Sequence, residues 1–279
     1  MTVINTNINA LIAKNAVNAN QRSLQTAMQS LATGSKINRA SDDAAGLAIR
    51  ENMTAQIKGF NAAVRNANDG ISLLQTADSA MEGMSSLLQR MRELGVLAQN
   101  DTYSSAQRTA MDDEFSALLS EVDRIATDTE WNGMPLLDGT GGDLGDASTF
   151  SFQVGANSSQ TIEVIISDQG TGGALSAIAS STVASAASAA TAVTSLDTAI
   201  AALASNRSVI GAAVNRLTYA SDNAASMSQN ASASRSQIAD TDYAAATSEL
   251  ARSQIVQQAG TAMLAQANQQ ASMVLALLR

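Results

Sequence analysis

Two long heptad repeats constrain this chain more than any other feature. In each repeat an apolar residue returns at every seventh position over several turns. The first consists of Met53, Phe60, Ala67, Leu74, Met81 and Leu88, and the second of Leu196, Leu203, Ile210, Leu217, Ala224, Ala231 and Ile238. Such spacing is typical of helices that pack against each other along their whole length. Asn68-Asp69-Gly70 would ordinarily signal a turn, but the first repeat runs through it in phase, so we predict an unbroken helix continuing to Asn100.

A further helix is expected after the break at residues 100–102. Its apolar residues, Met111, Phe115, Leu118, Val122 and Ile125, follow each other at steps of three or four. The connection is short, which favours an antiparallel pair.

Turn signals and a hairpin separate this helix from the second heptad repeat. Asn132-Gly133, Pro135 and the glycine-rich run 138–145 mark a change of direction. The β-prone runs at 150–154 and 161–166 predict a β-hairpin. The Ala/Ser-rich stretch 171–192 fits either a linker or a weak helix start.

The two ends of the chain are also helical in pattern. Gly34-Ser35 ends the N-terminal helix, and apolar residues advance along the C-terminal one at nearly the period of a straight helix. Neither end carries enough large apolar residues to fold alone, so a partner is implied. We take residues with the strongest apolar character as the contact surface: Ile4, Ile8, Leu11, Val256, Met263, Val274 and Leu278.

The predicted fold is therefore mainly α: an elongated antiparallel helical bundle or coiled coil with one small β-hairpin region near 148–168, and with the N- and C-termini together. Residues 1–40 with 240–279 would form one part, and residues 41–239 the bundle.

Composition excludes several classes of function. The chain has no histidine and no cysteine, which removes Ser-His-Asp and Cys-His catalysis, disulfides, and histidine or thiolate metal sites. A net charge of −9 argues against nucleic acid as a partner. Glutamines and asparagines in the uncharged stretch 253–278 make a membrane span improbable, and Asn5, Asn7 and Asn9 interrupt any signal-peptide core. We expect no enzyme activity and no cofactor.

Three acidic motifs have ordinary explanations. The run 138–146 resembles a single calcium-binding glycine-rich repeat, but such sites need stacked copies, so a solvated loop is favoured. The adjacent acids 112–114 point in different directions on a helix and fit a solvated face. Asp42 and Asp43 precede the first heptad helix, where helix capping accounts for them.

Several ordered blocks resemble bacterial flagellin. Near the N-terminus they are residues 4–8 (INTNI), 31–38 (LATGSKIN), 42–49 (DDAAGLAI), 66–74 (NANDGISLL) and 88–94 (LQRMREL); near the C-terminus they are 238–243 (IADTDY) and 258–268 (QAGTAMLAQAN). The resemblance covers about the first half and the last quarter of the chain. Only about sixty residues separate Trp131 from the second heptad helix, so the family's variable outer domain is expected to be absent or vestigial.

This resemblance implies a structural subunit of the flagellar filament that polymerises with itself. It further implies extracellular localisation without a cleaved signal peptide, a type III export apparatus, an export chaperone, and flagellar cap and hook-associated proteins as partners. A hook–filament junction protein is the alternative. An enzyme on the same frame or a membrane-active translocator would need an insert or an apolar span that the sequence lacks.

One candidate recognition surface follows from spacing and resemblance together. If the chain reverses near Thr102, Arg90 and Glu114 are equally distant from the turn and lie side by side with Leu94. In the heptad frame of Leu88, Arg90 and Leu94 fall outside the buried positions. In many flagellins the equivalent Arg, Leu and Glu form the surface detected by the host's Toll-like receptor 5.

Overall fold

The computed structural model describes residues 6–141 and 149–277, with side chains to residue 269. Within that part the helices are α1 (Ile8–Thr33), α2 (Ala44–Ala98), α3 (Ser105–Asp128), α4 (Ala186–Ala239) and α5 (Tyr243–Leu277), with a 3₁₀ turn at Ser176–Ile178. The strands are β1 (Glu130–Trp131), β2 (Met134–Pro135), β3 (Thr149–Gln153) and β4 (Thr161–Ile165). The predicted mainly α class is confirmed.

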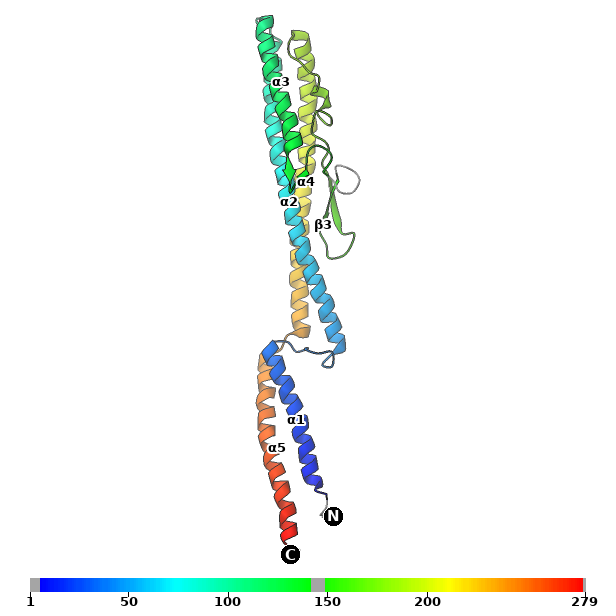
Figure 1. The fold of residues 1–279 in the computed structure, drawn as a ribbon, viewed down its shortest axis with the longest axis vertical. Coiled ribbons are helices and arrows are strands. Elements are labelled where there is room, and N and C mark those ends of the chain that lie inside the picture. The colour runs from blue at the N-terminus through cyan, green and yellow to red at the C-terminus, as the bar shows by residue number, and fades with distance from the viewer. Residues whose placement is uncertain (1–5, 142–148, 278–279) are drawn as a thin grey trace. The chain divides into compact units, whose positions relative to one another are not determined.

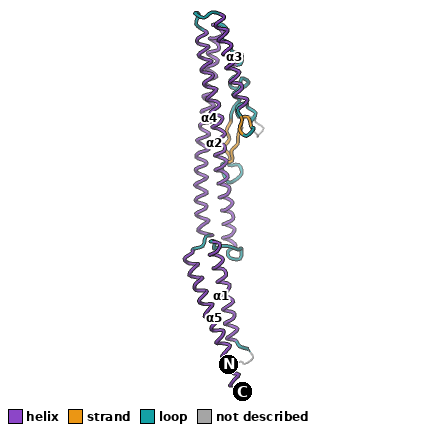
Figure 2. The backbone as a smooth tube through the Cα atoms, turned by 60° about the vertical axis from the view of Figure 1, so that its left-hand side comes forward, coloured by secondary structure: helices purple, strands orange, loops and turns teal. Residues whose placement is uncertain are grey.

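The chain divides into two compact units. The first consists of Met1–Ala55 with Asn230–Arg279, and the second of Gln56–Gln229. Helix α1 packs against α5 in the first unit, while α2, α3 and most of α4 lie side by side in the second (Figures 1 and 2).

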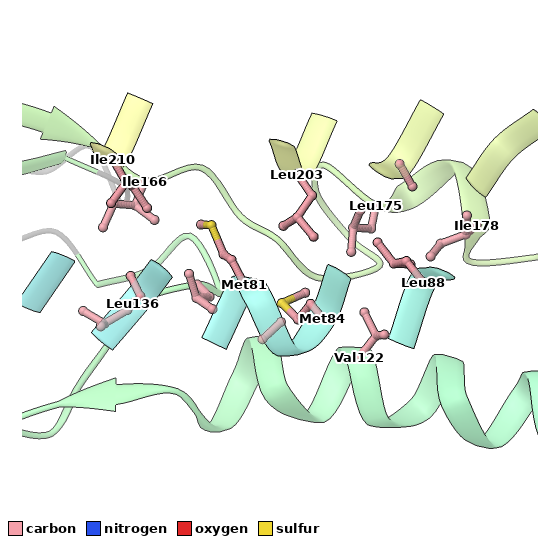
Figure 3. Packing of buried hydrophobic residues seen from close by; sticks show 14 of the residues in the cluster. Met81, Met84, Leu88, Val122, Leu136, Ile166, Leu175, Ile178, Leu203 and Ile210 are labelled. Atoms are coloured by element: carbon pink, nitrogen blue, oxygen red, sulfur yellow. The ribbon is translucent and has the colours of Figure 1, made fainter. Parts of the chain in front are cut away.

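The core of the second unit lies between α2, α3, α4 and the segment that precedes α4. Figure 3 shows Met81, Met84 and Leu88 of α2 facing Val122 of α3 and Leu203 of α4, with Leu175 and Ile178 closing one side. Several of these side chains are fully buried. The two heptad repeats thus supply facing stripes of one core, as their spacing predicts.

Helix α2 runs without interruption through Asn68-Asp69-Gly70, as predicted. Gly70 is buried, and a Cβ placed on it would lie 2.8 Å from Cδ1 of Phe152 in β3. The glycine is therefore explained by the close approach of an aromatic ring and does not mark a turn.

Local capping sets where the helices begin and end. The Asp43 carboxylate accepts a hydrogen bond from Gly46 N at 2.9 Å at the start of α2, as predicted. Ser104 and Gln107 form a reciprocal capping box at the start of α3. At the end of α1, Gly34 takes a φ of 68°, a left-handed conformation that favours glycine.

Two antiparallel hairpins follow α3. In the first, β1 pairs with β2 across Asn132 and Gly133, whose φ values of 52° and 77° are those of a type I′ turn. In the second, the predicted β3–β4 hairpin, Phe150 pairs with Val164 and Phe152 with Ile162. Alternate residues of β4 are buried, so one face of this hairpin covers the core.

The segment between β4 and α4 is held by hydrogen bonds to acidic side chains of α3. Asp112 accepts from Val183 N at 2.7 Å, and Asp123 accepts from Thr171 N at 3.1 Å and from its hydroxyl at 2.8 Å. The expectation of a purely solvated face at 112–114 is therefore wrong for Asp112, whose carboxylate pins a loop. The Ala/Ser-rich stretch contains the 3₁₀ turn, and α4 begins within it.

Helix α4 is long and apolar enough to cross a membrane by length and composition alone. The same holds for core helices of proteins that never enter a bilayer. Leu196, Leu203, Ile210 and Leu217 of α4 face the core described above.

Candidate interaction surface

Helices α1 and α5 form an antiparallel pair (Figures 1 and 2). The pair is joined at one end by backbone hydrogen bonds. Lys36 N donates to Ala239 O at 2.7 Å, and Thr241 N donates to Gly34 O at 3.0 Å. These bonds fix the point from which the two helices run on together.

Two asparagine amides bind the helices farther along. The Asn20 Nδ2 donates to Ser253 O at 2.7 Å and to the Gln257 Oε1 at 3.2 Å. The Asn7 Nδ2 donates to Ala267 O at 2.9 Å, while its Oδ1 accepts from Ala10 N and caps α1. Polar contacts from α1 side chains to α5 carbonyls thus help to hold the pair together.

Few apolar residues are fully buried between these two helices, although Leu24, Leu31, Leu250 and Leu264 are half-buried. Ala27 is the buried residue of α1 among those described. Large apolar side chains instead remain exposed on both helices: Ile8 (53%), Leu11 (56%), Ile12 (62%), Ile255 (67%), Val256 (45%) and Met263 (63%). Exposed apolar side chains that recur along both helices make this pair a candidate interaction surface.

The structure describes the side chains of four of the seven residues predicted from sequence as a contact surface. Ile8, Leu11, Val256 and Met263 are all exposed on the α1–α5 pair. Ile4 and Leu278 lie outside the described residues, and of Val274 only the backbone, within α5, is described. No acidic residue occurs before Asp42, and no charged residue lies between Ser253 and Leu278.

The second predicted surface is only partly as expected. The Arg90 guanidinium lies 2.9 Å from Glu114 and 2.6 Å from Glu93, which confirms that the α2–α3 hairpin brings Arg90 and Glu114 together. The hydrogen bond to Glu93 and, next in size, the one to Glu114 raise the pKa of Arg90 above its already high ordinary value. All three side chains are exposed.

Leu94, by contrast, is 2% exposed and belongs to the core, so the prediction that it is available to a partner is wrong. In this region α2 packs against α3 and α4 at once. A helix between two neighbours buries a wider stripe than a heptad seam between two helices, and Leu94 falls within that wider stripe.

The described residues offer little to a metal ion or a small ligand. They contain no group of three or more acidic side chains placed to hold a metal. An open depression of about 520 Å³ lies beside α4, lined in part by Ser167, Asp168 and Asn206. The buried Gln169 next to it accepts from Asn206 at 3.0 Å, and no buried side-chain polar atom in the described part lacks a partner.

Comparison with known proteins gives consistent matches along the chain. A family model for the bacterial flagellin N-terminal helical region matches residues 4–141, and one for the bacterial flagellin C-terminal helical region matches residues 193–278. A flagellin of Halalkalibacterium halodurans is 42% identical, over 99% of this chain and 100% of that protein. A flagellin of Bacillus subtilis is 40% identical, over 99% of each chain. The crystal structure of a Bacillus cereus flagellin is similar with a TM-score of 0.50 and 31% identity, over 57% of this chain and 88% of that one.

Proposed function

The chain belongs to the bacterial flagellin family and is a structural subunit of the extracellular flagellar filament, and from this premise we propose that it polymerises through the exposed apolar side chains of the α1–α5 pair. Flagellins assemble with themselves, and the family is structural rather than catalytic. The comparisons give no support to the alternative of a hook–filament junction protein.

The observation that carries this proposal is the exposure of Ile8, Leu11, Val256 and Met263 on helices whose contact with each other leaves these side chains uncovered. Burial of each such side chain against a neighbouring subunit contributes about 1.5–3 kcal/mol. Neighbouring copies would thus supply the hydrophobic contacts that the isolated pair lacks.

We assign residues 1–40 and 240–279 to the inner core of the filament and residues 41–239 to an outer helical shell. The α1–α5 pair supports the first assignment, because it exposes several large apolar side chains and carries few acids. The core of the second unit supports the other, because that unit buries its own large apolar residues. Without a large outer domain, the helical shell itself would form the filament surface.

The remaining partners are proposed from family membership. They are the flagellar cap, hook-associated proteins, an export chaperone and the type III export apparatus. Export without a cleaved signal peptide belongs to the same proposal and rests on family membership.

A test of the polymerisation surface replaces Met263 by Asp. An unpaired carboxylate would then enter a packed subunit contact at a cost of several kcal/mol per subunit. We expect sedimentation and electron microscopy to show no filaments, while the second unit melts as in the unmodified protein. Met227→Asp is the matched control, because Met227 is an exposed methionine of α4, outside the α1–α5 pair. Normal assembly of Met263→Asp would refute the proposed surface.

A second proposal concerns Toll-like receptor 5, for which Arg90 and Glu114 would form a contact. Both are exposed and joined to each other across the α2–α3 hairpin. Leu94 would act only by supporting α2 from the core. In a reporter-cell assay with monomer, Arg90→Ala and Glu114→Ala should lower potency. Arg92→Ala is the control, since Arg92 is equally exposed but pairs with Asp197 of α4. Equal potency of all three variants would remove this surface.

A further inference from the structure

The contact between α1 and α5 mixes small and polar residues with half-buried apolar ones such as Val17 and Leu264, while Ile8, Leu11, Val256 and Met263 remain exposed. Ser253 is 2% exposed and Ala27 is 8% exposed. Ser253, Gly260 and Ala267 follow each other at intervals of seven residues along α5, so they lie on one side of that helix.

The spacing of the two helices is set by Gly260. A Cβ placed there would lie 2.7 Å from Cγ2 of Val17, closer than unbonded carbon atoms approach. The α1 side chain therefore occupies the space that any residue larger than glycine would need. One heptad away on α5, this close approach allows the short Asn20 side chain to reach the backbone of Ser253.

The hydrogen bonds of Asn20 form only in one rotational setting of the helices, that is, with α1 and α5 each turned about its own axis to one orientation. Its amide donates to Ser253 O at 2.7 Å and to Gln257 Oε1 at 3.2 Å. These acceptors lie one turn apart on the same side of α5. If either helix turned about its axis, the amide would lose both of them, and a half-buried donor without a partner is unfavourable.

A different rotational setting would bring the exposed apolar side chains of α1 and α5 into the contact between them. Such a pair would bury those side chains within one chain. It would also hide the residues through which subunits meet. A single polar side chain in a helix interface is known to select one packing arrangement against apolar alternatives.

We propose that Asn20 and Gly260 are specificity-determining residues of filament assembly. They hold α1 and α5 in one rotational setting and so keep Ile8, Leu11, Val256 and Met263 turned outward for a second copy of the chain. This inference rests on the proposed polymerisation surface and names the residues that present it.

The first test replaces Asn20 by Leu, which has nearly the same shape and no amide. Asn18→Leu is the matched control, because Asn18 is exposed and makes no side-chain hydrogen bond in the described structure. We expect the critical concentration for polymerisation to rise at least about fivefold for Asn20→Leu, the effect of losing one hydrogen bond, and to stay nearly constant for Asn18→Leu.

The same variants should report the helix setting itself. Because the chain has no cysteine, spin labels can be attached at Lys14→Cys and Gln258→Cys, two exposed sites on α1 and α5. Labelled chains are diluted into unlabelled wild-type filaments, so that only distances within one chain are measured. We expect a displaced or broadened distance distribution for Asn20→Leu and an unchanged one for Asn18→Leu.

Distances and critical concentrations that match those of Asn18→Leu would overturn the inference. So would a raised critical concentration with unchanged distances, because Asn20 would then act directly on a neighbouring subunit. Both outcomes are compatible with the polymerisation surface. That surface is tested separately by Met263→Asp.

Gly260→Ala gives a second test, in which the direction of the change in critical concentration decides the outcome. Helix propensity alone predicts that alanine favours α5, since glycine is unfavourable inside a helix. The contact with Val17 predicts the opposite, a raised critical concentration. Adding Val17→Ala should restore assembly toward the level of Val17→Ala alone, because it removes the atom that the new methyl group meets. Improved assembly of Gly260→Ala alone would contradict the proposed role.

Discussion

Replacement of Gly70 by alanine should destabilise the second unit, whereas the same replacement at Gly83 should stabilise it. Both glycines lie inside α2, where alanine is favoured over glycine by about 0.5–1 kcal/mol. A Cβ at Gly83 would meet no atom within 4 Å, so that gain should appear in full. For a unit of this size it corresponds to a rise in Tm of about 1–4 °C.

At Gly70 the new methyl group would lie 2.8 Å from Cδ1 and 3.0 Å from Cε1 of Phe152. Overpacking of this kind costs about 1–3 kcal/mol, more than the helix gains. We expect a lower Tm, with the stability partly restored by Phe152→Leu in the same chain, because the smaller side chain can withdraw.

The assay is thermal unfolding followed by the fluorescence of Trp131. It is the one tryptophan of the sequence and packs against the core of the second unit, so it reports that unit alone. A higher Tm for Gly70→Ala would mean that Phe152 does not press on α2, and the explanation for an unbroken helix through Asn68-Asp69-Gly70 would fail.

Three further predictions follow. Leu88→Ala should lower the free energy of unfolding by about 2–5 kcal/mol in urea denaturation, because Leu88 is fully buried; a loss below about 1 kcal/mol would contradict that burial. Hydrogen bonding from Arg92 lowers the pKa of Asp197, so the Arg92–Asp197 pair should stabilise the fold above about pH 4 and lose this effect as the pH falls through the lower folded pKa. Wild type should therefore lose slightly more stability than Asp197→Asn between pH 5 and 3. Equal losses would refute the pairing. Amide hydrogen exchange should be fast in α1 and α5 of the monomer and slow in the filament, since the pair buries too little to offset ordering entropy; strong protection in the monomer would contradict this.

The sequence was most informative where the apolar face of one helix packs against another helix of the same chain. The two heptad repeats predict α2 and α4 because the apolar residues of each repeat pack against apolar residues of a neighbouring helix. The β3–β4 hairpin was also predictable, since alternation and loop length act locally. Leu94 was misplaced because a two-helix frame cannot represent a helix that packs against two neighbours.

The terminal helices show the opposite case. Their apolar residues indicate which side chains favour burial, but the pattern does not say whether the partner lies in the same chain. The structure pairs α1 with α5 through Asn20 and Gly260, residues that no hydrophobic pattern selects. The hydrogen bond of the Asn20 side-chain amide depends on the distance between the two helices. That distance is known only once both helices are placed in three dimensions.

The core of the second unit also determines which contacts form late during folding. Arg207 of α4 pairs with Asp78 of α2 at 2.7 Å, across 129 residues of sequence. Contacts so distant along the chain form late, because a long loop must close before they contribute. A chain of which only the first two thirds have been synthesised therefore lacks the α4 side chains that pack with Met81 and Leu88. The core of the second unit can close only once α4 has joined α2.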